Sequence, residues 1–235
     1  MCEHFVARAS EPFRLDELWP FTERLERYGL AGYGWGASWL TPQNTLDSYR
    51  DVHAFRDDPA VGTVGAVETT SILLHLRRPS KLSTLQLADT QPFVDPAGRF
   101  SFSHNGDLRR IREARRQFQA EDRIHGRADT EVGARWLEDA WGTMTPGEAL
   151  SCMHQTFGGQ ANLAVLTSRG NVVAYAGNTE NPIFTFRFGR IGIVSTAIYS
   201  IDRSLFRFVA PGATDRGVVK PGVAVALDGR GSVIR

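Results

Sequence analysis

The order in which strand-like and helix-like segments follow one another is the feature that most constrains this fold. Alternating or near-continuous apolar runs predict strands over residues 2–9, 32–39, 71–77 and 100–103. Helical patterns then cover residues 108–120, 128–141 and 146–157, and short strands separated by Gly and Asn turns follow over 162–195. Strands on both sides of a central helical block predict an α+β fold. Two antiparallel sheets stacked between helical layers would accommodate this order of elements.

The remaining segments are less regular. Residues 15–28 predict a helix that begins near Pro20, and Thr145-Pro146-Gly147-Glu148 is a capping box that starts another helix. Residues 43–60 are interpreted as a short helix or a surface excursion. Residues 209–212 and 223–227 are expected to close the chain with another strand and a final hairpin at 228–229.

Composition excludes several classes of protein. The 235 residues are 42% hydrophobic and 23% charged, which suits a packed core, and no segment marks a boundary, so we expect one domain over 1–235. The net charge is +1 without a basic arm, so nucleic acid is not an expected partner. No apolar segment suits a membrane span, and Glu3 and Glu11 argue against a signal peptide. The two cysteines, Cys2 and Cys152, are therefore interpreted as reduced thiols in the cytoplasm.

Cys2 is the strongest candidate for a catalytic residue. Removal of Met1 would leave Cys2 with both a thiol and a free α-amino group. Their ordinary pKa values are roughly 8.5 and roughly 8, so the amine can take the thiol proton near neutral pH. The alternative is a chance cysteine in a frayed terminus.

His104-Asn105-Gly106 follows a predicted strand and supplies groups that such a nucleophile needs. The Asn105 amide and the Gly106 N–H could together stabilise an oxyanion, and Gly106 would let the backbone approach the substrate without a Cβ. The alternative is a simple turn, because Asn-Gly is common in turns.

Two charged residues could hold the ends of an amino acid. Arg77, at the end of a buried strand, could bind a carboxylate through two hydrogen bonds, although its neighbour Arg78 is equally plausible and both could be surface residues. Asp129, at a helix start, could bind an ammonium group, or it could be an ordinary N-cap that accepts from Glu131 or Val132. A thiol, an oxyanion hole, a cation and an anion together fit glutamine or a γ-glutamyl amide.

The chain resembles the class II glutamine amidotransferases of the N-terminal-nucleophile (Ntn) hydrolase superfamily, in particular their stand-alone glutaminase domains. The resemblance covers nearly the whole chain. The matching segments are, in order, Met1-Cys2, Gly34-Trp35-Gly36, His75-Leu76-Arg77, Asp89-Thr90-Gln91-Pro92-Phe93, His104-Asn105-Gly106, Asp129-Thr130-Glu131 and Val209-Ala210-Pro211-Gly212.

This resemblance implies a four-layer α-β-β-α sandwich and a role for each candidate residue. Cys2 would be the nucleophile, its α-amine the base, and Asn105 with Gly106 the oxyanion hole. Arg77 would hold the substrate α-carboxylate and Asp129 its α-amino group. His104 is expected to contribute to substrate binding. No metal or organic cofactor is implied.

The chain departs from the family pattern at the acyl pocket. Arg77 is followed by Arg78-Pro79-Ser80-Lys81 in place of the Ala-Thr and Gly of many relatives, so either Ser80 replaces the Thr hydroxyl or the loop has a different shape. Asp89 and Gln91 stand where relatives have Asn and His. These differences put the preferred substrate in doubt.

Three alternatives remain at the level of function. The chain could be a glutaminase that delivers ammonia to a separate synthetase, or a free-standing hydrolase of a γ-glutamyl metabolite. It could instead be a catalytically silent binding or scaffold domain, which the altered 77–83 loop favours. A metal site built from Cys2, His4, His75 and His104 is disfavoured because the spacing matches no known pattern.

Overall fold

The computed structural model describes residues 2–79, 82–196 and 205–234, which contain thirteen strands and six α-helices. The strands are β1 (Glu3–Arg14), β2 (Trp35–Leu40), β3 (Leu46–Asp51), β4 (Glu68–Leu76), β5 (Phe93–Val94), β6 (Phe100–Gly106), β7 (Ala161–Thr167), β8 (Val172–Tyr175), β9 (Ile183–Phe188), β10 (Ile191–Thr196), β11 (Thr214–Val218), β12 (Ala224–Leu227) and β13 (Val233–Ile234). The helices are α1 (Trp19–Gly29), α2 (Val61–Gly65), α3 (Arg112–Ala120), α4 (Asp129–Ala140), α5 (Pro146–Phe157) and α6 (Leu205–Val209).

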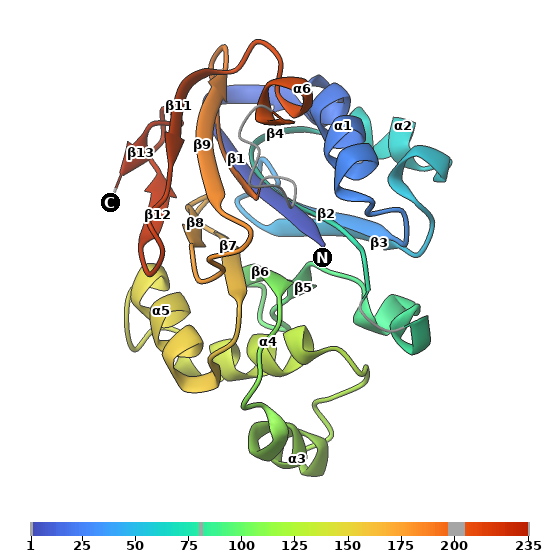
Figure 1. The fold of residues 1–235 in the computed structure, drawn as a ribbon, viewed down its shortest axis with the longest axis vertical. Coiled ribbons are helices and arrows are strands. Elements are labelled where there is room, and N and C mark those ends of the chain that lie inside the picture. The colour runs from blue at the N-terminus through green and yellow to red at the C-terminus, as the bar shows by residue number, and fades with distance from the viewer. Residues whose placement is uncertain (1, 80–81, 197–204, 235) are drawn as a thin grey trace.

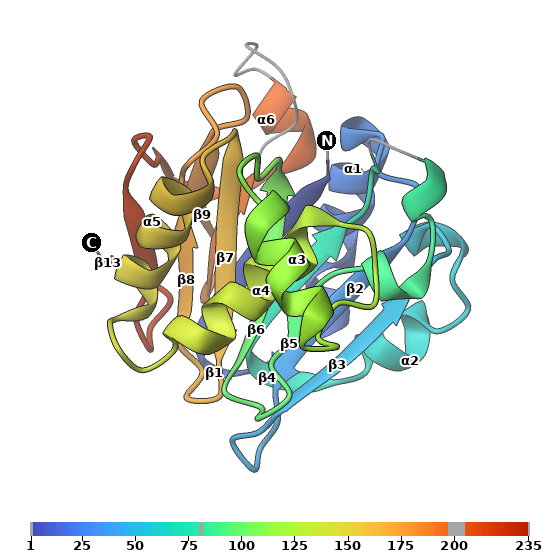
Figure 2. The ribbon, with the colours of Figure 1, turned by 90° about the horizontal axis from the view of Figure 1, so that it is seen from below.

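The strands form two antiparallel sheets. The first has seven strands in the order β11-β9-β10-β1-β4-β2-β3, and the second has six in the order β13-β12-β8-β7-β6-β5. Helices α1, α2 and α6 lie on the outer side of the first sheet (Figure 1). Helices α4 and α5 cover the second sheet (Figure 2), and α3 lies outside α4, as Figure 1 shows.

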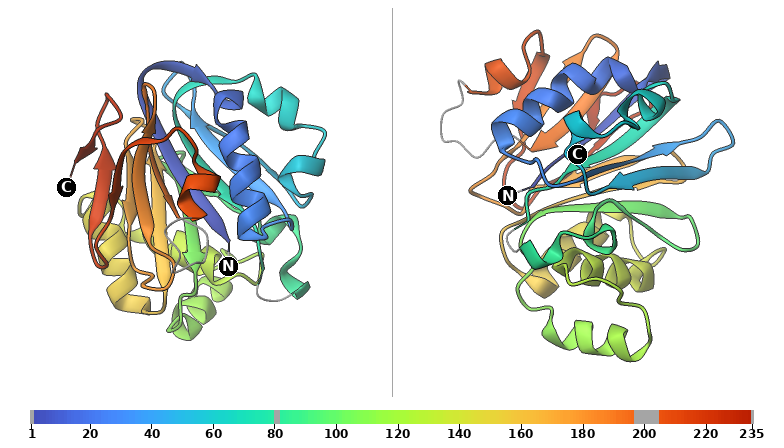
Figure 3. Two further views of the ribbon diagram at one scale, coloured as in Figure 1. Left: turned by 45° about the horizontal axis from the view of Figure 1, so that its top comes forward. Right: turned by 90° about the vertical axis from the view of Figure 1, so that its right-hand side faces the viewer.

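Three separate hydrophobic clusters fill the spaces between these layers. One packs α1 and α6 against the seven-stranded sheet through residues such as Phe5 and Phe21. Another packs α4 and α5 against the six-stranded sheet through Leu137 and Met153. The third lies between the sheets and includes Val6, whose side chain points opposite to that of Phe5, as strand alternation requires. Three cores between four layers confirm the predicted α+β, α-β-β-α sandwich (Figure 3).

Several local predictions are confirmed. Helix α1 has Pro20 in its first turn, and α5 begins with the capping box in which Thr145 and Glu148 exchange hydrogen bonds. Strand β2 is approached closely by other backbone, because a Cβ at Gly36 would lie 2.3 Å from the carbonyl oxygen of Gln91.

Other predictions were wrong. Residues 46–51 form strand β3, not a helix or excursion, because they pair with β2 at the edge of the sheet. Helix α3 begins only at Arg112, and Val209 ends helix α6. Strand β11 was not predicted, since its alternation is weak and its pairing with β9 is irregular.

None of the helices within the described ranges is both long enough and apolar enough to cross a membrane.

Candidate active site

A cavity of about 790 Å³ opens where the ends of β1, β4 and β6 come together. Of the residues that were assigned a catalytic or binding role and that the structure describes, five line it, namely Cys2, Arg77, His104, Gly106 and Asp129, whereas Asn105 is not part of the lining. They come from both sheets and from the start of α4, so it is the stacking of the layers that brings them together.

The Cys2 thiol is anchored to the chain segment that follows β4. The main-chain N–H of Arg78 donates to Sγ of Cys2 at 3.2 Å, and Sγ lies 3.5 Å from the Arg78 carbonyl oxygen. Burial raises the pKa of the Cys2 thiol, while the Arg78 N–H and the charge of Arg77 act in the opposite direction. Because the pKa is raised, the thiol needs a base to become an effective nucleophile near neutral pH.

Asn105 lies against the main chain of Cys2, with its amide in a defined orientation. Its Nδ2 donates to the Cys2 carbonyl oxygen. Its Oδ1 accepts from Nδ2 of Asn162 at 3.2 Å and from Nδ2 of Asn181 at 3.1 Å. Since both neighbours donate, the Oδ1 end must face them and the Nδ2 end must face the main chain of Cys2.

The Gly106 N–H faces the cavity side of β6. In the β6–β7 ladder, Asp107 N–H bonds the Gln160 carbonyl, so alternation turns the N–H groups of residues 104 and 106 away from β7. The N–H of His104 is accepted by Oε1 of Gln91 at 2.7 Å. The Gly106 N–H lies two residues further along the same edge, where the cavity begins.

Glycine at position 106 has a packing reason that the sequence analysis did not include. Gly106 has φ of +122°, and a Cβ there would lie 1.7 Å from the main-chain oxygen of Gln160. Glycine is therefore required by the contact with the chain leading into β7.

Hydrogen bonds to the segment 84–90 hold the Arg77 side chain and leave one edge of its guanidinium unbonded. The side chain is only 4% exposed, and burial lowers its pKa. Its Nη1 donates to Gln86 O and Thr90 Oγ1, and its Nη2 donates to Thr84 O. One N–H on Nη2 and the Nε–H are left without a hydrogen-bond partner among the described residues. No described carboxylate lies within ion-pair distance of the Arg77 guanidinium. That edge matches the geometry of a bidentate carboxylate.

Asp129 is the first residue of α4 and is not its N-cap. The cap position is Ala128, which has no side-chain cap, so the alternative prediction of Asp129 as an ordinary N-cap was wrong. Oδ2 of Asp129 instead accepts from the Leu108 N–H at 2.7 Å, and Oδ1 from the Thr130 N–H at 3.0 Å. Each oxygen keeps a further lone pair for a ligand in the cavity.

Two residues treated only as departures from the family pattern connect the parts of this site. Gln91 links β6 to α4, because its Oε1 accepts from His104 N and its Nε2 donates to Thr130 Oγ1 at 3.1 Å. Asp89 is buried, and its Oδ1 accepts from the N–H groups of Arg127 and Ala128, both at 2.6 Å. It thereby holds the segment that presents Asp129.

His104 is buried against the start of α4. Its Nδ1 lies 3.1 Å from Thr130 Oγ1 and 3.9 Å from Asp129 Oδ1. Burial lowers its pKa, with Asp129 acting in the opposite direction. His104 therefore lines the cavity as a neutral imidazole at neutral pH. Ser80, the other residue expected to bind substrate, lies outside the described residues.

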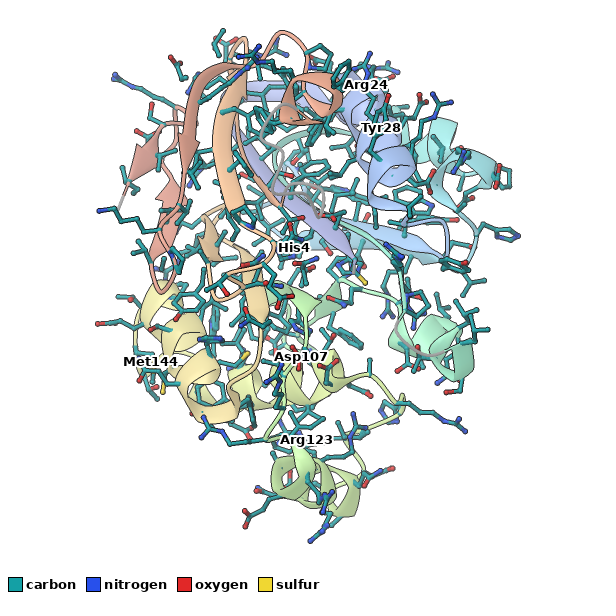
Figure 4. The ribbon with its side chains drawn as sticks, viewed as in Figure 1. His4, Arg24, Tyr28, Asp107, Arg123 and Met144 are labelled. Carbon is teal, nitrogen blue, oxygen red and sulfur yellow. The ribbon has the colours of Figure 1, made fainter. Side chains whose placement is uncertain are left out.

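The histidines of the metal-site alternative have other partners. Nδ1 of His4 lies 3.0 Å and Nδ1 of His75 lies 2.9 Å from Oγ of Ser103. His4 lies near the middle of the molecule, whereas Asp107 lies closer to the α3–α5 layer (Figure 4). Within the described residues, no group of three or more His, Cys, Asp or Glu side chains could hold a metal ion.

Some members of the site had no recognisable signal in the sequence. Asn162 and Asn181, which orient Asn105, belong to a region where Asn was interpreted only as a turn residue. The main-chain groups of Arg78 carry no signal in any sequence, because every residue except proline has the same N–H.

Comparison with solved structures identifies the fold. The chain is similar over its full length to glutamine phosphoribosylpyrophosphate amidotransferase from B. subtilis, with 19% identity and a TM-score of 0.76 over 49% of that chain. Over 96% of its length it is similar to a structure described as the allosteric regulatory enzyme of purine biosynthesis, with 16% identity and a TM-score of 0.74 over 47% of that chain.

A third solved structure matches in length as well. It is described as a glutamine aminotransferase class-II domain protein from Silicibacter pomeroyi, with 16% identity, a TM-score of 0.62, and coverage of 95% of this chain and 94% of that one. No protein-family model and no curated protein sequence matches the chain. The chain thus spans about half the length of the first two structures, and it has the Ntn-hydrolase fold that was predicted.

Proposed function

We propose, from the amidotransferase fold and the contents of the cavity, that this chain is a class II glutaminase that hydrolyses the γ-amide of glutamine or a γ-glutamyl compound. The observation that carries the proposal is that Cys2, Arg77, Gly106 and Asp129 line one cavity. A nucleophile, an oxyanion donor, a cation and an anion are the groups that a γ-glutamyl amide requires.

In this proposal, the amino-acid end of the substrate is held between two opposite charges. The free edge of Arg77 takes the α-carboxylate through two charge-assisted hydrogen bonds. Asp129 takes the α-ammonium group with the lone pairs left on its oxygens. Holding this end places the δ-carbonyl of the substrate against Cys2.

The reaction proceeds through a thioester. With Met1 removed, the α-amine of Cys2 takes the thiol proton, and the thiolate attacks the δ-carbonyl. The Gly106 N–H and the second N–H of Asn105 Nδ2 stabilise the oxyanion. The C–N bond then breaks, and the α-ammonium protonates the departing ammonia or amine. Water finally hydrolyses the γ-glutamyl thioester, which yields glutamate and restores the thiol.

We further propose that residues 1–235 form one glutaminase domain in the cytoplasm, with no cofactor in the reaction. The ammonia or amine then has two possible fates. It is passed to a separate synthetase subunit, or it is released by a free-standing hydrolase. A synthetase that co-purifies with the chain would favour the first fate.

The experiment is a panel of γ-glutamyl amides incubated with wild-type protein, Cys2→Ala and the matched control Cys152→Ala. Cys152 is the other free cysteine and lies on α5, outside the cavity lining. We expect glutamate release by wild type and Cys152→Ala and none by Cys2→Ala. Mass spectrometry of the intact protein should show the mass without Met1.

Full activity in Cys2→Ala would refute the mechanism. If the processed protein releases no glutamate from any member of the panel, the catalytically silent alternative is favoured instead.

A further inference from the structure

The cavity is larger than the part of it that the proposed reaction uses. Its volume of about 790 Å³ lies in the upper part of the roughly 300–1,000 Å³ range of sites for drug-sized ligands, and glutamine is much smaller than such a ligand. The lining also includes three side chains to which the reaction gives no role, those of Arg78, Arg115 and Arg127. A substrate that fills the cavity would therefore be longer than glutamine.

The amide nitrogen is the position at which such a substrate can be extended. In the proposed binding mode, Arg77 takes a free α-carboxylate and Asp129 takes a free α-ammonium group, so neither group at the α-carbon carries a substituent. The δ-carbonyl lies against Cys2. A γ-glutamyl group whose two ends are free can be extended only at its amide nitrogen. The rest of the cavity consequently faces the amine component of the substrate.

Main-chain contacts fix one wall of this part of the cavity. Nη2 of Arg115, on α3, donates to the carbonyl oxygens of Arg127 at 3.1 Å and Ala128 at 2.6 Å. Nη1 of Arg115 donates to the Gly126 carbonyl oxygen at 3.4 Å. From the other side, Asp89 accepts the main-chain N–H groups of Arg127 and Ala128. The segment 126–128 is thus held at both its N–H and its C=O groups, and it presents the Arg127 side chain at the cavity.

The positive charge in this part of the cavity is not neutralised by ion pairs. None of the ion pairs among the described residues includes Arg78, Arg115 or Arg127. Arg78 lies on the side of the nucleophile, because its main-chain N–H is 3.2 Å from Sγ of Cys2. The charge therefore borders the position of the reacting amide.

The carboxylates of the lining have other partners. Asp107 forms an ion pair with Arg109 at 2.7 Å, and the pKa of Arg109 is raised mainly by this carboxylate and further by Glu180. Asp89 accepts from Nε2 of Gln86 at 2.9 Å in addition to its two main-chain donors. With Asp129 assigned to the α-ammonium group, the charge that is left to face the amine component is positive.

We propose that Arg78, Arg115 and Arg127 form a second anion-binding subsite, and that the preferred substrate is a γ-glutamyl amide whose amine component carries a carboxylate or a phosphate group. Guanidinium groups bind both anions through charge-assisted hydrogen bonds. Hydrolysis then yields glutamate and an acidic amine. This inference rests on the proposed function, because it concerns the amine released from the same γ-amide.

The first test uses pairs of substrates that differ in one charged group. γ-Glutamylglycine is compared with γ-glutamylglycinamide, and the γ-glutamyl amide of phosphoethanolamine with that of ethanolamine. We expect the kcat/KM of wild type to be about 10-fold higher for the anionic member, because several partly exposed charges each contribute modestly. The pair with the larger ratio identifies a carboxylate or a phosphate as the anion. Equal values within both pairs overturn the inference and leave the proposed function intact.

Arg78→Gln and Arg127→Gln test the subsite itself. Each variant removes one exposed guanidinium, so we expect each to lower the preference for the anionic member about 3-fold and the double variant to remove most of it. Arg116→Gln is the matched control, because Arg116 is exposed on α3 beside Arg115 and lies outside the lining. It should keep the wild-type preference. An equal loss in Arg116→Gln would mean that overall charge selects the anion, which overturns the proposed subsite.

A binding measurement separates this inference from the proposed function. In Cys2→Ala, calorimetric titration with the same pairs gives Kd without turnover, and we expect the anionic member to bind about 10-fold more tightly. Adding Arg127→Gln should reduce this difference. If the anionic members bind more tightly although wild type hydrolyses none of the amides, the subsite stands and the proposed function fails. Equal binding of both members overturns the inference whether or not hydrolysis is observed.

Discussion

The main-chain N–H of Arg78 lies 3.2 Å from the Sγ atom of Cys2, so the segment after β4 holds the candidate nucleophile at the start of β1. This contact depends on the register of two neighbouring strands, in which Glu3 pairs with Leu76. A shift of that register by one residue would move Cys2 to the other face of the sheet. The position of the sulfur is thus a property of the sheet, and side-chain changes around it can be tested one at a time.

Replacing Asn105 should lower the rate without greatly changing substrate affinity. Asn105→Ala removes the Nδ2 donor that faces Cys2, and we expect kcat to fall roughly 10²–10³-fold with KM nearly unchanged. Steady-state kinetics with glutamine or the best γ-glutamyl amide provide the measurement. Asn162→Ala, which removes only one of the two donors to Oδ1 of Asn105, should have a smaller effect. An unchanged kcat in Asn105→Ala would remove this residue from the oxyanion hole.

Arg77 should act on binding of the α-carboxylate. Arg77→Lys loses the bidentate edge and the bonds to the loop carbonyls, and we expect kcat/KM for glutamine to fall about 10–100-fold, since hydrogen bonds to charged groups are worth roughly 1.5–3 kcal/mol. The discriminating substrate is 4-aminobutyramide, which lacks that carboxylate. Wild type should strongly prefer glutamine over it, and Arg77→Lys should lose most of the preference. Arg78→Lys, which keeps the main-chain contact to Cys2, should retain it.

Gly106→Ala should damage the fold as well as the site. The Cβ of an alanine would lie 1.7 Å from the Gln160 oxygen, and the residue would have to keep φ at +122°, which L side chains rarely adopt. We therefore expect a loss of about 2–4 kcal/mol in the free energy of unfolding. Gly98→Ala is the control, because Gly98 has φ of +68° with no atom within 4 Å. It should lose only about 1 kcal/mol. Urea unfolding of both variants tests this, and equal losses would contradict the packing argument.

The buried His4 should make the protein sensitive to acid. Burial lowers the pKa of His4 to about 3 from its ordinary value near 6.5, so the unfolded chain binds more protons between these values. Its contribution to stability is complete above about pH 6.5 and is lost as the pH falls towards 3, by an amount on the order of a few kcal/mol. His4→Asn should lose less stability than wild type between pH 6.5 and 4 in urea unfolding.

The sequence was sufficient for the class of fold and for the residue types of the site. Apolar alternation is set locally, so strands such as β4 and β6 and the capping box of α5 could be predicted from neighbouring residues alone. The short motifs around Arg77, Asn105 and Asp129 likewise indicated chemistry, since side-chain type limits what each group can bind.

Contacts between distant segments could be decided only by the tertiary structure. Strand β3 forms because β2 offers it an edge, and Gly106 is required because the chain leading into β7 passes 1.7 Å from where a Cβ would be. The Asn181 amide donates to Oδ1 of Asn105 although the two residues are 76 positions apart in the chain. A sequence specifies each donor and acceptor, but which donor meets which acceptor depends on how the two sheets stack, because their packing sets every distance across the cavity.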